Sequence, residues 1–456
     1  MIVKTKRSGT IRRHVVSKAF KHTRHIRKQL YSYALPSIVG MLIVGIQMLV
    51  DGIFVSRGVG ALGLAAVNLS MPLISIMLSV CIMIVSGGVV IAGVAQGEGD
   101  DRRSRGYTTL TGVVLLLACL AMSAVVACSL SKLCYFMGAD ESVFPYMRSY
   151  LGIIGCGFLF YCIPNFTEAF NRLAGRPNWV FISGSICCVV NVVLDYFFVI
   201  RFGWGTKGAA IATCIANSSA AAVLLPNVRF GRICGSLRVV GRIFYNGSSE
   251  MFTAISCSIT SYIFNIVLMR MTGPTGVAAL TIVCYLNMIV NMSIFGLSQA
   301  LYPLMSYQLG ARNYRGIRTL LRSSLQLGGF IGIGTYLLVL AFKWPIVRAF
   351  AANDPELMKL AYVAATYVTL HYLASFFNII ASSFHTAVER PIESVVISVC
   401  RSVAFVMIPL FVLMPHIGVM AVWLSMPIAE ALTLLVAIPL VAVSMRRLRK
   451  MLNGKC

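Results

Sequence analysis

Charged residues are scarce in this sequence. Of its 456 residues only 12% are Asp, Glu, Lys or Arg and only 14 are acidic, whereas 58% are hydrophobic. The mean hydropathy of +0.84 excludes the common classes of soluble protein. Most of the apolar runs reach the roughly 20 residues that cross a bilayer as a helix. The composition therefore indicates an all-α polytopic membrane protein.

Patterns typical of catalysis and metal binding are also missing. The sequence has no HExxH and no nucleophile-elbow pattern, so we do not expect an intramembrane hydrolase or another enzyme. Its 14 cysteines include no CxxC pair, and most of them fall inside apolar runs. We therefore expect small apolar packing residues, without disulfides, cofactors or metal sites other than a possible Na+ site.

Twelve apolar segments are long enough to span a bilayer. They lie at about 31–55, 64–95, 106–130, 147–173, 178–202, 207–228, 247–270, 277–308, 317–341, 358–386, 391–414 and 417–444. An even number of spans places both termini on one side of the membrane.

The net charge of +25 arises from the loops on one side of these spans. Residues 1–30 are rich in Lys and Arg and contain no acid, and basic clusters follow the second, fourth, sixth, eighth and twelfth spans. Because basic loops remain in the cytoplasm, both termini are expected inside the plasma membrane, the inner membrane of a bacterium. The basic excess then faces anionic lipid headgroups, and we expect no nucleic-acid partner.

The chain repeats itself at a nearly constant offset. A shift of 213 residues aligns Gly60 with Gly273 and Gly97 with Gly310, and a shift of 214 aligns Pro177 with Pro391. We expect two six-helix lobes related by a pseudo-two-fold along the membrane normal, with a binding cleft between them. The expected division is a basic tail 1–30, an N-lobe 31–228, a cytoplasmic loop 229–246, a C-lobe 247–445 and a basic tail 446–456.

Two carboxylates inside the N-lobe lack counterparts in the C-lobe. Asp51 aligns with Phe264 or Asn265, and Asp195 aligns near Pro409. Acids inside spans are costly and usually mark function, so this asymmetry indicates chemistry in one lobe.

Four N-lobe groups are expected at one depth, in the outer half of the bilayer. Asp51 lies near the outer end of the first span, Asn191 and Asp195 share a helix face at i,i+4, and Thr213 begins the return span. Two acids, an amide and a hydroxyl can hold a small cation or share protons. A hydrogen-bonded cluster that only ties helices together is the structural alternative.

Other intramembrane polar residues have plainer interpretations. Glu168 should form a surface i,i+4 pair with Arg172, and Glu393 should suit the first turn of a helix. Glu430 has no obvious basic partner. His371 and His385 can either pack with hydrogen bonds or relay protons.

The order and spacing of several segments resemble the multidrug and toxic compound extrusion (MATE) transporter family. These segments are LPSIVGM, VDGIFVSRGVG, LGLAAVNLSMPL, GVAQGEGD, NRLAGRPN, NVVLDYFF, GTKGAAIAT and GLSQALYPLMSYQLGARN. The resemblance covers nearly all of the chain from Leu30 to Ser444.

This resemblance implies a V-shaped central cavity and alternating access driven by H+ or Na+. It places a cation site on Asp51, Asn191, Asp195 and Thr213, and a helix bend at Pro36. Glu250 matches an acidic position of some branches, and Tyr302 stands where related members often carry glutamine. The tenth span lacks an acid that another branch uses, which argues against a cation site in the C-lobe.

We therefore expect a monomeric antiporter that exports amphipathic, often cationic organic compounds in exchange for H+ or Na+. By position, the candidate substrate-cavity residues are Gln47, Asn68, Met71, Glu250, Met288, Gln299 and Tyr302. The alternative is a flippase-type exporter of a lipid-linked or other endogenous metabolite, which the scarcity of Lys and Arg inside the spans disfavours. A membrane enzyme or sensor leaves the repeat and the one-lobe acids unexplained.

The topology predicts the outcome of reporter fusions. A reporter that is active only outside the cell should give signal after residues 140, 205 and 354, and none after residues 103, 235 and 456, because basic loops are retained inside. Reversal at any two of these sites contradicts the topology.

Overall fold

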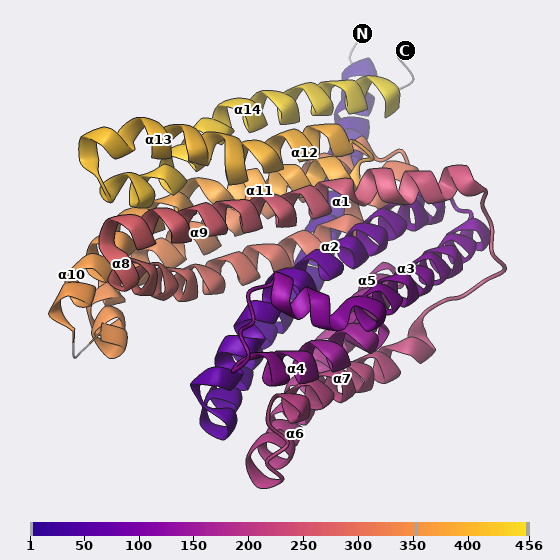
Figure 1. Ribbon diagram of the computed structural model, residues 1–456. Coiled ribbons are helices and arrows are strands. Elements are labelled where there is room, and N and C mark those ends of the chain that lie inside the picture. Colours follow the sequence, from indigo (N-terminus) through magenta and orange to yellow (C-terminus); the bar gives the residue numbers. More distant parts are fainter. Residues whose placement is uncertain (1–2, 352–353, 453–456) are drawn as a thin grey trace.

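The computed structural model describes residues 3–351 and 354–452, and this part is built from helices and short connections (Figure 1). The N-terminal half contains α1 (Val3–Val59), α2 (Ala61–Gly97), α3 (Asp101–Phe136), α4 (Phe144–Cys156), α5 (Phe158–Leu173), α6 (Pro177–Asp195), η1 (Tyr196–Arg201), α7 (Gly205–Leu224) and η2 (Leu225–Asn227). The C-terminal half contains α8 (Leu237–Gly310), α9 (Tyr314–Ala351), α10 (Pro355–Val368), η3 (Thr369–His371), α11 (Tyr372–Ala387), α12 (Pro391–Val399), η4 (Cys400–Ala404), α13 (Phe405–Ile417) and α14 (Met420–Leu452).

These helices supply the twelve expected spans. Ten described helical segments are long and apolar enough to cross a membrane, and α4 with α5, bent by 47° at their junction, makes a further span. The 74-residue α8 is interrupted at Gly273, whose φ of 64° and ψ of −154° are not helical. Because this break divides α8 into two spans, each half of the chain contributes six.

The internal repeat is visible in the backbone. Left-handed φ angles occur in pairs separated by 213 or 214 residues: Gly60 with Gly273, Gly99 with Arg312, Gly175 with Glu389, and Gly205 with Gly418. Each pair lies at an equivalent break or connection between helices in the two halves. The two halves are therefore copies of one six-helix design, as expected.

The two lobes meet at the end of the molecule that carries both termini, and their helices diverge towards the other end (Figure 1). The repeat-related Gly97 of α2 and Gly310 of α8 lie at this junction. A Cβ atom added at Gly97 would lie 2.1 Å from the Tyr307 carbonyl oxygen, and one added at Gly310 would lie 2.0 Å from that of Val94. Since residues related by a two-fold touch only near its axis, the pseudo-two-fold passes between α2 and α8.

Helix ends differ from the expected boundaries on this side. The loop expected at 229–246 is shorter, because α8 begins at Leu237. The basic tail expected at 1–30 is the first part of α1 from Val3 onwards, and α14 continues to Leu452 in the other tail. Residues 1–2 and 453–456 lie outside the described part.

The left-handed turn after α2 allows a test of backbone strain without a packing change. Gly99 has a φ of 84°, yet a Cβ there meets no atom within 4 Å, so Gly99→Ala should lower the free energy of unfolding by about 1 kcal/mol through strain alone. Gly241 in α8 also has open space and no left-handed φ, so Gly241→Ala should stabilise by up to about 1 kcal/mol. Unfolding in detergent measures both, and equal effects of one sign contradict the explanation.

Candidate functional site

The four predicted cation-site residues come from three neighbouring helices of the N-lobe. Asp51 lies in α1, Asn191 and Asp195 lie in α6, and Thr213 lies in α7. The side chains of Asn191 and Asp195 are fully buried, Thr213 is 9% exposed and Asp51 is partly buried. The Asp51 and Asp195 carboxylates interact directly, so the structure brings the two acids together.

This cluster contains buried polar atoms without hydrogen-bond partners. They are Asp51 Oδ1, Asn191 Oδ1 and Nδ2, and both carboxylate oxygens of Asp195. Thr213 donates its hydroxyl hydrogen to the Ala209 carbonyl at 2.9 Å, which leaves its oxygen lone pairs available. Because buried polar groups are nearly always satisfied, these orphan oxygens are the chemistry expected of a site for protons or a cation.

Sequence reasoning missed two tyrosines beside these acids. Tyr150 of α4 and Tyr161 of α5 both lie within electrostatic range of Asp51, and Tyr150 also lies within range of Asp195. Neither position is marked by a motif, since the bent span formed by α4 and α5 brings them there. Asp195 itself is the last residue before the π-helical turn η1, a local distortion often found at functional sites.

Helix α1 passes through Pro36 as one continuous helix. The bend at Pro36 remains a prediction. The next residue, Ser37, accepts a hydrogen bond on its hydroxyl from Arg172 Nε at 3.3 Å.

The Glu168–Arg172 pair was expected on the surface, and that expectation is wrong. Arg172 NH2 binds Glu168 Oε2 at 2.9 Å, and the Arg172 side chain is only 4% exposed. Its contact with Ser37 links α5 to α1, and this buries the guanidinium between the two helices.

A cleft between the lobes is lined by α1, α2, α5 and α8. It is bounded by Met41, Ile82, Val85, Ser86, Val89, Asn165, Glu168, Ala169, Arg172, Phe295, Gln299, Tyr302 and Pro303. Gln299 and Tyr302, both predicted for the substrate cavity, are therefore in its wall. Glu250 is adjacent to it, because the Tyr302 hydroxyl donates a hydrogen bond to Glu250 Oε1.

The other four predicted cavity residues are outside the described lining of this cleft. Gln47 lies beside Cys187, between α1 and α6. Asn68 is exposed on α2 and Met71 packs on the N-lobe core. Met288 of α8 approaches α1, since its Cε lies 3.0 Å from a Cβ built at Gly45.

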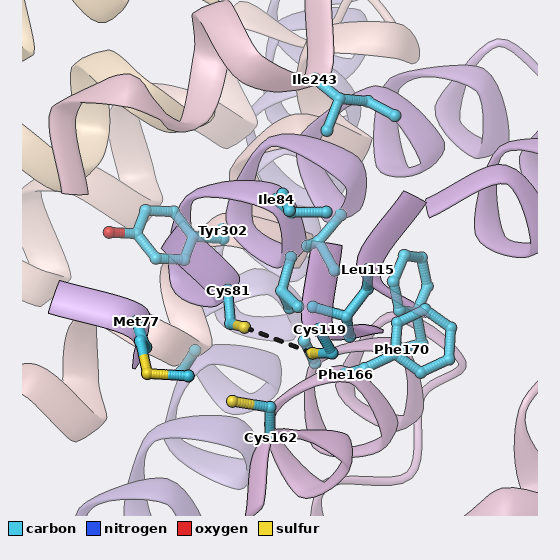
Figure 2. Close-up of a cluster of buried hydrophobic side chains, with 14 of the residues drawn as sticks. Met77, Cys81, Ile84, Leu115, Cys119, Cys162, Phe166, Phe170, Ile243 and Tyr302 are labelled. Carbon is cyan, nitrogen blue, oxygen red and sulfur yellow. Dashed lines mark hydrogen bonds between the residues drawn. The ribbon is translucent and has the colours of Figure 1, made fainter. Parts of the chain in front are cut away.

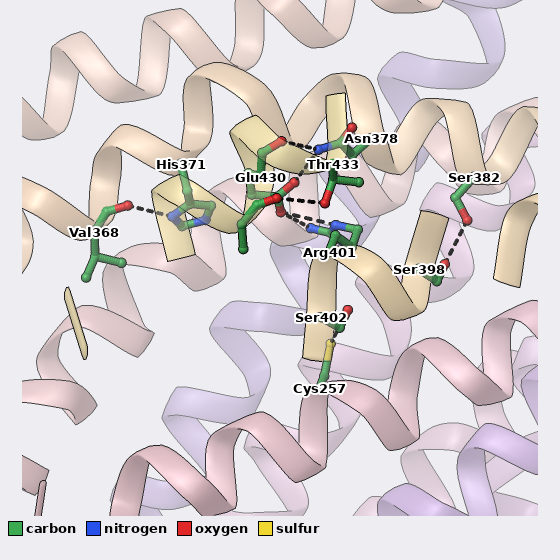
Figure 3. Close-up of polar contacts among 11 residues, drawn as sticks. Cys257, Val368, His371, Asn378, Ser382, Ser398, Arg401, Ser402, Glu430 and Thr433 are labelled. Atoms are coloured by element: carbon green, nitrogen blue, oxygen red, sulfur yellow. Dashed lines mark hydrogen bonds and ion pairs between the residues drawn. The ribbon is translucent and has the colours of Figure 1, made fainter. Parts of the chain in front are cut away.

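The C-lobe buries a complete ion pair (Figure 3). Arg401 Nε and NH2 bind Glu430 Oε1 at 3.1 and 2.7 Å, and Asn378 Nδ2 donates to Glu430 Oε2 at 2.6 Å. The expectation that Glu430 has no basic partner is therefore wrong. The partner was missed because positions 401 and 430 are 29 residues apart, on two helices that pack only in the fold.

The remaining polar candidates of the C-lobe are held by hydrogen bonds. His371 Nδ1 lies 2.6 Å from the Val368 carbonyl oxygen, and His385 Nδ1 lies 2.7 Å from that of Ala381. Glu393 stands in the first turn of α12 and binds Arg390 NH1 at 3.0 Å. These contacts fit packing and capping roles, so the unsatisfied carboxylates of the N-lobe stand out as the site with free chemistry.

The MatE family profile matches residues 36–197 and 251–413, one match in each half of the chain. The FAD transporter of Shewanella oneidensis is 23% identical over 89% of this chain and 92% of its own length. The multidrug export protein MepA of Staphylococcus aureus is 20% identical over 92% of this chain and 94% of its own. Among solved structures, the Vibrio cholerae MATE transporter VcmN in the bent form has a TM-score of 0.87 and 20% identity, covering 94% of this chain and 99% of that one.

The two family matches together cover most of the chain, and their arrangement follows the two lobes. The fold is shared with solved MATE transporters over nearly its whole length. The chain is a multi-pass membrane protein of the MATE transporter family.

Proposed function

We propose that this protein is a secondary antiporter that exports amphipathic organic cations in exchange for protons, with Asp51, Asn191, Asp195 and Thr213 as the coupling site. The observation that carries the proposal is the pair of facing N-lobe carboxylates whose buried oxygens lack hydrogen-bond partners. Two adjacent acids hold two negative charges poorly, so they take up a proton readily and release it when the surroundings change.

The distribution of charge supports a cationic cargo. Arg172 and Arg401, which lie inside the spans, are neutralised by Glu168 and Glu430. Glu250, by contrast, is held by the hydroxyl of Tyr302 beside the central cleft. Aromatic and thioether groups in the cleft wall, such as those of Tyr302, Phe295 and Met41, favour adaptable binding of organic cations.

Export of an endogenous, anionic metabolite is the second candidate, because one relative is named an FAD transporter. An anionic cargo needs positive charge in the cleft, and Arg172 in its wall already binds Glu168. The MepA relatives are named multidrug export proteins, which agrees better with the charge of this cleft.

The proposed topology fits the direction of export. With both termini in the cytoplasm, the end at which the lobes meet is the inner side, and the diverging end faces outward (Figure 1). Protonation at the N-lobe site would then bend α1 at Pro36, narrow the N-lobe and expel the cargo outward. The two lobes of one chain enclose the cleft, so a monomer is sufficient.

Substituting either acid should uncouple transport without unfolding the protein. Asp51→Asn and Asp195→Asn should each reduce gradient-driven efflux of a fluorescent cation by at least about tenfold, because each removes a titrating group. Thermal unfolding in detergent should show an equal or higher midpoint, since one of two facing charges is gone.

The matched control is Glu141→Gln, which changes an exposed acid in the connection between α3 and α4 and should leave efflux unchanged. Efflux at the wild-type rate by both Asp variants refutes the coupling site.

The coupling ion is tested separately in vesicles that contain the purified protein. Efflux should appear with an imposed pH difference alone and should vanish when an ionophore dissipates that difference. Efflux of FAD run in parallel should be absent. If the cation moves only when sodium is added, sodium bound by the same oxygens is the coupling ion and the proton assignment is wrong.

A further inference from the structure

Three cysteines meet in the core of the N-lobe, away from the acid pair (Figure 2). Cys81 comes from α2, Cys119 from α3 and Cys162 from α5, and all three side chains are fully buried. The Sγ atoms of Cys81 and Cys119 are 3.7 Å apart, and the three Sγ atoms lie within 4.8 Å of one another. The expectation that the cysteines serve only as separate packing residues does not describe these three.

The spacing of the thiols suits one shared central atom. Three thiolates at the usual metal–sulfur distance of about 2.3 Å around one centre lie roughly 4 Å apart. The existing separations approach that value, so small side-chain rotations are enough to close the site. Because each sulfur comes from a different helix, a bound atom would join α2, α3 and α5.

The surroundings select the charge of that atom. The hydrophobic cluster around the thiols includes Ile84, Leu115, Phe166 and Phe170 (Figure 2). A charged complex in such a setting is costly. Three thiolates carry a charge of minus three, so a monovalent or divalent ion leaves a net negative charge, whereas a trivalent centre gives a neutral complex.

We propose that Cys81, Cys119 and Cys162 form a binding site for a trivalent, thiophilic metalloid of the arsenite class. The neutral hydroxide exchanges its ligands for the three thiols: As(OH)3 + 3 Cys–SH gives As(S–Cys)3 + 3 H2O. Three As–O bonds break and three As–S bonds form. Each thiol proton leaves in a water molecule, and no atom is oxidised or reduced.

Arsenite is the probe, applied to the full-length protein in detergent with a phosphine reductant that keeps the thiols reduced. After desalting, the wild type should retain one tightly bound arsenic per chain. Cys81→Ala, Cys119→Ala and Cys162→Ala should each weaken binding at least about tenfold, because two sulfurs bind less tightly than three. Zinc should not displace the arsenic.

Two controls separate this site from other thiols. Cys128→Ala changes an exposed cysteine on the same helix as Cys119, and Cys188→Ala removes one of the adjacent Cys187 and Cys188, which can hold arsenic by two bonds. Both variants should bind as the wild type does. Arsenite should also raise the thermal midpoint of the wild type and of both controls, but not that of the three site variants.

The three site variants are independent, so misfolding of one, seen as a lowered midpoint without arsenite, leaves two tests. Tight binding that survives all the folded site variants overturns the proposal, as does the absence of tight binding in the wild type. Displacement of arsenic by zinc overturns the choice of a trivalent ligand.

Discussion

The glycine contacts between α2 and α8 fix the arrangement of the two lobes. Besides Gly97 and Gly310, a Cβ at Gly87 would lie 1.9 Å from the Ile243 carbonyl oxygen, and one at Gly247 would lie 1.8 Å from that of Met83. Backbones this close leave no room for any side chain, and small residues give such contacts between helices in a membrane. The lobes are therefore joined along a seam without side chains at one end, and their other ends are free to separate around the cleft.

The same backbone carries different charges in the two lobes. Shifts of 214 and 213 residues place Cys187 and Asn217 opposite Arg401 and Glu430. In the N-lobe the contact is a long one, 3.8 Å from Cys187 Sγ to Asn217 Oδ1, whereas in the C-lobe it is a buried ion pair. The C-lobe thus satisfies its internal charges, while the N-lobe leaves carboxylate oxygens without partners. Repeat symmetry supplies the framework, and departures from it place the titrating chemistry in one lobe.

Composition and the repeat were enough to predict the twelve spans and two lobes, because long apolar runs and a constant offset are properties of the chain itself. The meeting of Asp51 with Asp195 was also predictable from depth, since helical rise converts sequence distance to height. Contacts across helices that depend on rotation were not. The Arg401–Glu430 pair, the position of Tyr150 and the three converging cysteines each require knowing which helix faces face one another.

Helix α1 touches both the N-lobe site and the central cleft. Asp51 and Ser37 are 14 residues apart on it, about 21 Å along the helix. At Ser37 the helix is held by Arg172 and is packed against α8, where a Cβ at Gly296 would lie 2.7 Å from the Ser37 carbonyl oxygen. Gln299 and Tyr302 follow on the same segment of α8. Any movement of α1 at Pro36 must therefore break a buried hydrogen bond and shift the cleft wall, which gives one helix a physical means of linking ion binding to cargo release.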